Sequence, residues 1–218
     1  MNPIEKTILS LDWITLVLFG ALVLLALGKY LNHSKFLNFI ILPFNDKYVL
    51  FHSKKGQLFD WFQFLLTLFQ ILNLALFILI VLHVYGVLEN EMEARTYFIV
   101  FGALFLFEFL KSILQLFTGF VFNNTKLIGG LIFNKISYLN FSSLVVAIAN
   151  ILLVYILKDS KTIIYGTFFL FIVINGIGIL KLLKNHQNAL FPYFIYFILY
   201  LCTLEIAPLV LIGSFIKG

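Results

Sequence analysis

Six long apolar runs follow one another along the chain, and short polar segments separate them. Each run approaches or exceeds the roughly 20 residues that a helix needs to cross a bilayer core of about 30 Å. None shows the strict alternation of a membrane β-barrel strand. The runs are Leu9–Leu27, Leu58–Val84, Tyr97–Phe120, Leu139–Leu157, Ile163–Leu183 and Leu190–Ile216. The pattern predicts an all-α fold, a polytopic transmembrane helical bundle of about six spans that forms one domain over residues 1–218.

Polar residues recur at steps of three and four inside spans two, three and four, which places them on one face of each helix. The stripes are Asp60, Gln63, Thr67, Gln70 and Asn73; Glu108, Lys111, Gln115 and Thr118; and Asn140, Ser143, Ala147 and Asn150. We expect these faces to turn inward, where they serve either as hydrogen-bonded glue between helices or as a functional site. In span five, Asn175 with Gly176 and Gly178 marks a close-packing or flexible point.

Three ionisable residues lie near the middle of apolar runs, where charge is costly and usually has a partner. Glu108 and Lys111 are three residues apart and can pair on their own helix. Glu205 has no nearby cation in its own span, so the three groups are candidates for one mid-membrane cluster. Pro208 removes a backbone donor and predicts a kink beside Glu205. The cluster fits internal packing as well as it fits a proton or ion relay.

The connection between spans one and two contains an apolar stretch, Phe36–Phe44, that is too short to span. Because Lys35 and Lys47 flank it, we interpret it as an interfacial amphipathic connector. It is either a lipid-sensing or gating element or an ordinary surface connector. The stretch Asn123–Tyr138 is a candidate for a second short interfacial piece.

Two Asp-Trp pairs lie near span ends: Asp12 with Trp13, and Asp60 with Trp61. Tryptophan is enriched at the headgroup level of bilayers, so these pairs are interpreted as interfacial anchors. The alternative is a catalytic carboxylate that acts on a lipid phosphate.

Composition agrees with a membrane protein, since 62% of the residues are hydrophobic and 11% are charged. The one cysteine, Cys202, lies in a span, and the four histidines lack ligand spacing, so we expect no disulfide framework, metal site or cofactor. No catalytic motif was found, hence no catalytic residue is assigned. The net charge of +5 arises beside the spans and favours the lipid bilayer over nucleic acid as a partner. A small-molecule ligand stays unidentified.

Lysine and arginine are unequally divided between the two sides of the predicted bundle, with nine on one side and five on the other. The positive-inside rule places the richer side, which includes Lys35 and Lys47, in the cytoplasm. Both termini are then periplasmic.

Three segments resemble an integral-membrane family of unknown function from Bacteroidota. They are Leu11-Asp12-Trp13, the connector Leu42-Pro43-Phe44-Asn45-Asp46-Lys47-Tyr48, and the ending Tyr200-Leu201-Cys202-Thr203-Leu204-Glu205-Ile206-Ala207-Pro208. The resemblance implies the inner membrane of a Gram-negative cell, and it supplies no catalytic residue.

We therefore expect a non-catalytic subunit or scaffold of a larger cell-envelope complex, with other membrane subunits as partners. The second reading is a carrier or channel for a proton, an ion or a lipid that uses Glu108, Lys111 and Glu205. The third is an enzyme on a lipid-linked substrate that uses Asp12 or Asp60 with loop lysines.

Overall fold

The computed structural model describes residues 12–45, 60–87, 93–121 and 125–185. The chain divides into two compact units, Met1–Gly178 and Ile179–Gly218, and the packing described below lies within the first. The predicted sixth span, with Glu205 and Pro208, falls outside the described residues, as does Lys47. The single-domain assignment stays a prediction.

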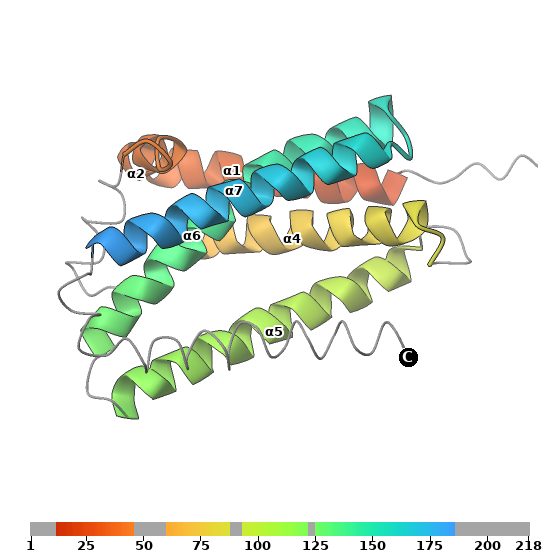
Figure 1. Ribbon diagram of the computed structural model, residues 1–218. Helices are drawn as coiled ribbons and strands as arrows, with labels where there is room; N and C mark the ends of the chain where they lie inside the picture. Colours follow the sequence, from red (N-terminus) through yellow and green to blue (C-terminus); the bar gives the residue numbers. More distant parts are fainter. Residues whose placement is uncertain (1–11, 46–59, 88–92, 122–124, 186–218) are drawn as a thin grey trace, which may run out of the picture. The chain divides into compact units, whose positions relative to one another are not determined.

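Five helices in the described part of the chain are long and apolar enough to cross a membrane. Figure 1 shows them as long rods, without a strand among the described residues. They are α1 (Asp12–Leu31), α4 (Trp61–Val84), α5 (Ala94–Val121), α6 (Thr125–Ile151) and α7 (Lys161–Asn185). The predicted all-α, membrane-spanning fold is confirmed, and the first, second, third and fifth spans begin within three residues of their predicted starts.

Helix α4 is the central element, because it packs against α1, α5 and α6. In the most apolar 18-residue stretch of α4, 56% of the residues are buried, whereas in that of α5 only 6% are. The α4 core residues Phe62, Leu66, Phe69, Leu76 and Leu79 are all at most 1% exposed. A helix that is apolar on nearly all sides is expected at the centre of a bundle.

Helix α6 begins at Thr125, well before the predicted start of span four at Leu139. The proposed interfacial piece at Asn123–Tyr138 is therefore wrong: from Thr125 onward this stretch is the first half of one helix. Asn134 and Ser137 lower the hydropathy of this stretch, yet both are buried, and the Ser137 hydroxyl donates to the Phe133 carbonyl at 2.7 Å. The helix continues as one π-helical turn, η1 (Leu152–Ile156), stabilised by the bond from the Leu157 amide to the Leu152 carbonyl.

The predicted amphipathic connector forms α2 (His33–Ile40) and a following turn. Figure 1 shows α2 end-on, so its axis crosses the direction of the spans. Its inner side carries Phe36, Phe39 and Leu42, which are buried against the bundle. Its outer side is also apolar and exposed, with Leu37, Ile40, Ile41 and Phe44. His33 and Ser34 are exposed as well, so the connector shows both apolar and polar side chains, which suits a position where protein meets lipid at the interface.

Helix α7 approaches α6 closely at Gly178, which belongs to the first unit. A Cβ atom on Gly178 would lie 2.5 Å from the Tyr138 ring, so a larger residue does not fit there. Gly176 has no such neighbour. Of the two roles proposed for this pair of glycines, close packing is the one that Gly178 fulfils.

Candidate functional site

A cavity of about 470 Å³ lies between α4, α5 and α6 in the first unit. Its walls are mainly aromatic and aliphatic, with a few polar groups among them. The polar lining residues are Asp60, Gln63, Thr67, Glu108 and Ser112; the apolar ones are Phe64, Ile71, Phe105, Phe109, Ile113, Leu116, Ile132, Phe133 and Ile136. A largely apolar cavity with a few convergent polar groups is the usual form of a small-molecule site.

Glu108 meets a partner on the neighbouring helix. Its Oε1 atom accepts a hydrogen bond of 3.4 Å from Nε2 of Gln70 on α4. The two side chains Glu108 and Lys111 form no ion pair with each other in the described structure; the Lys111 ammonium instead lies 5.5 Å from the centre of the Phe107 ring. The predicted pairing within one helix is therefore replaced by a contact between helices, which fixes the Glu108 carboxylate beside the cavity.

The Gln70–Glu108 contact has an excess of hydrogen-bond acceptors. Gln70 is 1% exposed, and its Oε1 atom has no hydrogen-bond donor among the described residues. The hydroxyl of Ser112, another lining residue, donates to the Glu108 backbone carbonyl and not to the carboxylate, whose bond comes from Gln70. A buried acceptor without a donor costs free energy, but Gln70 does not line the cavity. The Glu108 carboxylate does line it, and it is an acceptor that a hydrogen-bond donor in the cavity can reach.

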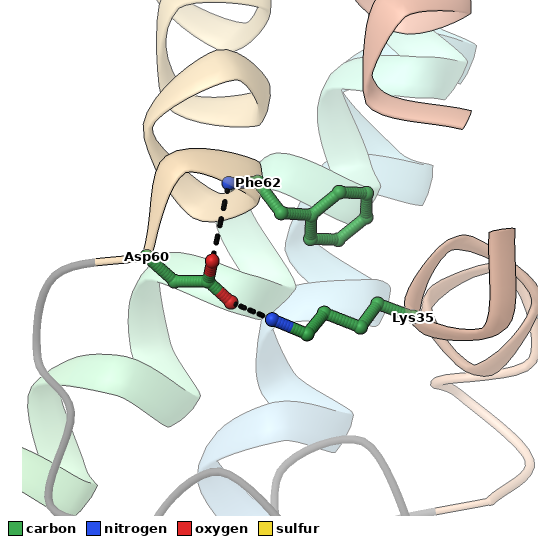
Figure 2. A network of polar contacts seen from close by, with 3 residues as sticks. All are labelled: Lys35, Asp60 and Phe62. Carbon is green, nitrogen blue, oxygen red and sulfur yellow. Dashed lines mark hydrogen bonds and ion pairs between the residues drawn. The ribbon is translucent and has the colours of Figure 1, made fainter. Parts of the chain in front are cut away.

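One end of the cavity lies at the start of α4, where Asp60 binds Lys35 of α2 (Figure 2). The Lys35 ammonium is 2.5 Å from Oδ2 of Asp60, and the side chains are 31% and 15% exposed. Oδ1 of Asp60 also accepts a hydrogen bond of 3.4 Å from the Phe62 amide, which caps the first turn of α4. Asp60 therefore holds α2 against α4 and orders the α4 N-terminus at the same time.

The buried side-chain amides of α4 and α6 donate hydrogen bonds to backbone carbonyls and to a hydroxyl. The side-chain amide of Asn150 donates to the Asn73 carbonyl at 2.9 Å, and that of Asn73 donates to the Phe69 carbonyl. Asn140 donates to the Thr67 hydroxyl at 3.4 Å. The polar stripes of these two helices thus face inward, as their spacing predicts. The candidates Gln70, Asn73, Gln115 and Asn150 are all buried, and their functional role stays a prediction.

The two Asp-Trp pairs lie at opposite ends of the helices. Helices α1 and α4 run in opposite directions, so Asp12 and Trp13 are far from the Lys35–Asp60 contact (Figure 1). The Trp13 ring packs against Tyr97 with ring centres 5.5 Å apart. Trp61 is 70% exposed at the start of α4. This arrangement gives each end of the helices an aromatic residue at the level where headgroups are expected.

Sequence reasoning missed the cavity itself. Phe105, Phe109 and Phe133 read as ordinary lipid-facing or packing residues, and Ser112 has no unusual neighbour in the sequence. Only the packing of three helices brings them together. The spacing of Ser112 four residues after Glu108 was the one available signal. No group of metal-ligating side chains was found in the part of the chain that the structure describes.

Long apolar helices, inward polar stripes and an interfacial connector define the class of this protein, a polytopic α-helical membrane protein. Within that class, the chain belongs to the family described as a domain of unknown function (DUF4271), which matches residues 14–216. No curated protein and no solved structure shows significant similarity to the chain. The family is thus shown over nearly the whole chain, and the function has to be inferred from the site.

Proposed function

We propose that the protein is a non-catalytic subunit or scaffold of a larger membrane complex in the cell envelope. Support comes from α5, which carries Glu108 and Lys111 although only 6% of its most apolar stretch is buried. A helix that carries ionisable groups at this depth is normally covered by protein. The proposal assigns that cover to helices of partner subunits.

A second face of α5 is apolar, exposed and apart from the cavity. Leu106, Leu110, Leu114 and Phe117 recur at steps of three and four residues, so they share one face of the helix. They are 59%, 58%, 51% and 62% exposed, and none of them lines the cavity. The proposal assigns this exposed apolar face to a partner helix.

The experiment is affinity purification of the tagged protein from native membranes at its endogenous level. A photoreactive amino acid is placed at Leu110 on α5, which is 58% exposed, and in a control at Phe169 on α7, which is 68% exposed. A scaffold co-purifies with partners in fixed ratio, and Leu110 crosslinks to a partner while Phe169 crosslinks to lipid. A protein that purifies alone, with Leu110 crosslinked only to lipid or to its own chain, contradicts the proposal.

A second candidate function is a carrier or channel for a proton, an ion or a lipid. The specific observation that favours it is Glu108, an ionisable side chain that lines a cavity at the level of the apolar spans. Reconstitution of the purified protein alone into liposomes tests it. Flux that is abolished by Glu108→Gln supports this candidate, and absence of any flux removes it.

We further propose the inner membrane of a Bacteroidota cell as the location, with both termini in the periplasm. The excess of basic residues on the side of α2 supports this orientation. In that case the Lys35–Asp60 contact faces the cytoplasm. Reporter fusions after Gly218 check it: a periplasmic phosphatase is active there and a cytoplasmic fluorescent reporter is dark. The reverse result inverts the topology.

A further inference from the structure

We propose that the cavity between α4, α5 and α6 binds a membrane-dissolved amphiphile that presents a hydrogen-bond donor, a hydroxyl or an ammonium group, to Glu108. This site is separate from the partner-binding role and does not depend on it.

The cavity is long and follows the helices. On α4 its lining runs from Asp60 to Ile71, and on α5 from Phe105 to Leu116. Each stretch covers about 16 Å at the rise of an α-helix, which is about half of a bilayer core. A volume of about 470 Å³ lies within the range of known ligand sites, roughly 300 to 1,000 Å³. An aliphatic or isoprenoid chain fits such a space.

The side of the cavity is accessible from the apolar phase. Its floor is buried, since Ile71, Ile132 and Phe133 are 3%, 7% and 4% exposed. Its rim is not: Phe64, Phe105, Phe109, Ile113 and Leu116 are 39% to 55% exposed. A molecule that is dissolved in the bilayer can therefore reach the floor sideways, between α4 and α5, without crossing the interface.

The Glu108 carboxylate at the inner end accepts hydrogen bonds. It lines the cavity and receives one long bond, from Gln70. A ligand that brought only a carboxylate or a carbonyl would place a further acceptor beside it. A hydroxyl or an ammonium group supplies a donor, so the ligand is expected to carry one of these.

The end of the cavity next to α2 holds a second carboxylate. There Asp60 is bound to Lys35 (Figure 2). Because the Asp60 carboxylate already binds a cation, the proposal assigns the donor of the ligand to Glu108.

The test uses three photoreactive C16 probes that differ only in the terminal group: an alcohol, an amine and a carboxylic acid. The full-length protein is placed in lipid nanodiscs, and labelled peptides are mapped by mass spectrometry. We expect the alcohol and the amine to label the cavity stretches of α4 and α5 at least fivefold more than the acid. Excess unlabelled alcohol should compete with this labelling.

Two substitutions at Glu108 separate the hydroxyl from the ammonium group. Glu108→Leu removes the acceptor and should reduce labelling by the alcohol and the amine to the level of the acid. Glu108→Gln keeps an acceptor without a charge, so it should retain labelling by the alcohol and lose most of the labelling by the amine. If only the amine labels the wild-type cavity, the ligand is an ammonium amphiphile.

Gln115→Leu is the matched control, because Gln115 is a buried polar residue of the same helix that does not line the cavity. Its labelling should equal that of the wild-type protein. If Glu108→Leu fails to assemble, Ile113→Trp narrows the rim and leaves Glu108 in place, and it should block all specific labelling. Equal labelling by the three probes, or labelling that neither Glu108→Leu nor Ile113→Trp reduces, overturns the proposal.

Discussion

The side-chain amide of Asn150 on α6 donates a hydrogen bond of 2.9 Å to the backbone carbonyl of Asn73 on α4. Both residues are at most 1% exposed, and they are 77 positions apart in the chain. A hydrogen bond between side chain and backbone is insensitive to the identity of the accepting residue, so Asn150 is the partner whose replacement breaks it.

We predict that Asn150→Asp is more destabilising than Asn150→Leu. Leucine loses the bond but also removes the buried Oδ1, which has no donor among the described residues, so the cost should be near 0.6 kcal/mol. Aspartate places an acceptor against the Asn73 carbonyl and should cost about 1 to 3 kcal/mol. Thermal unfolding in detergent measures the order. Ile148→Leu is the control, because Ile148 lies on the same helix and is 61% exposed. Equal losses of stability in the two Asn150 variants would contradict the prediction.

Gly178→Ala should destabilise the contact of α7 with α6. The added Cβ would lie 2.5 Å from the buried Tyr138 ring, and overpacking of this kind costs about 1 to 3 kcal/mol. Gly176→Ala serves as the matched control, because nothing lies within 4 Å of its Cβ position, and it should be neutral or slightly stabilising. Melting temperatures in detergent give the comparison. The double variant Gly178→Ala with Tyr138→Leu should lose less than the sum of the single effects.

Asp60 combines an ion pair and a helix cap, and two substitutions separate these roles. Asp60→Asn keeps the cap and loses the charge, which should cost about 0.2 to 1 kcal/mol for a partly exposed pair. Asp60→Ala loses both and should cost about 1 kcal/mol more. All three variants, Asp60→Asn, Asp60→Ala and Lys35→Gln, should speed up amide hydrogen exchange in α2. Only Asp60→Ala should also speed it up in the first turn of α4. Identical exchange in Asp60→Asn and Asp60→Ala would rule out the capping role.

The outer side of α2 should contact lipid at the headgroup level. A nitroxide label at Phe44→Cys, 91% exposed, is expected to show a shallow depth by paramagnetic accessibility, in a background with Cys202→Ser. The comparison is Leu106→Cys, 59% exposed near the middle of the α5 span, which should lie deep in the hydrocarbon. A label at Phe44 that is fully accessible to water-soluble relaxation agents would show that α2 stands away from the membrane.

The class of the protein follows from the sequence alone, because the residues of an apolar run themselves decide whether that run can cross a membrane. A run of about 20 apolar residues has to be helical in lipid, since no other local structure satisfies its backbone groups. The inward faces of α4 and α6 follow in the same way from steps of three and four residues. The connector Phe36–Phe44 was also predictable, because its length excludes a span and its composition excludes an aqueous loop.

The start of α6 was not predictable, because burial against neighbouring helices makes polar residues tolerable where an isolated helix would expose them to lipid. Asn134 and Ser137 lowered the local hydropathy, but tertiary contacts bury both. Hydropathy counts residues one at a time, whereas the cost of a polar group depends on the partners that surround it.

The sequence by itself determined that Glu108 lies in a span and shares a helix face with polar neighbours. Only the tertiary structure decided that its hydrogen bond comes from Gln70 on another helix, and that a cavity lies beside it. The physical reason is that helical spacing defines which residues share a face, while the helix that meets this face depends on how all the helices pack.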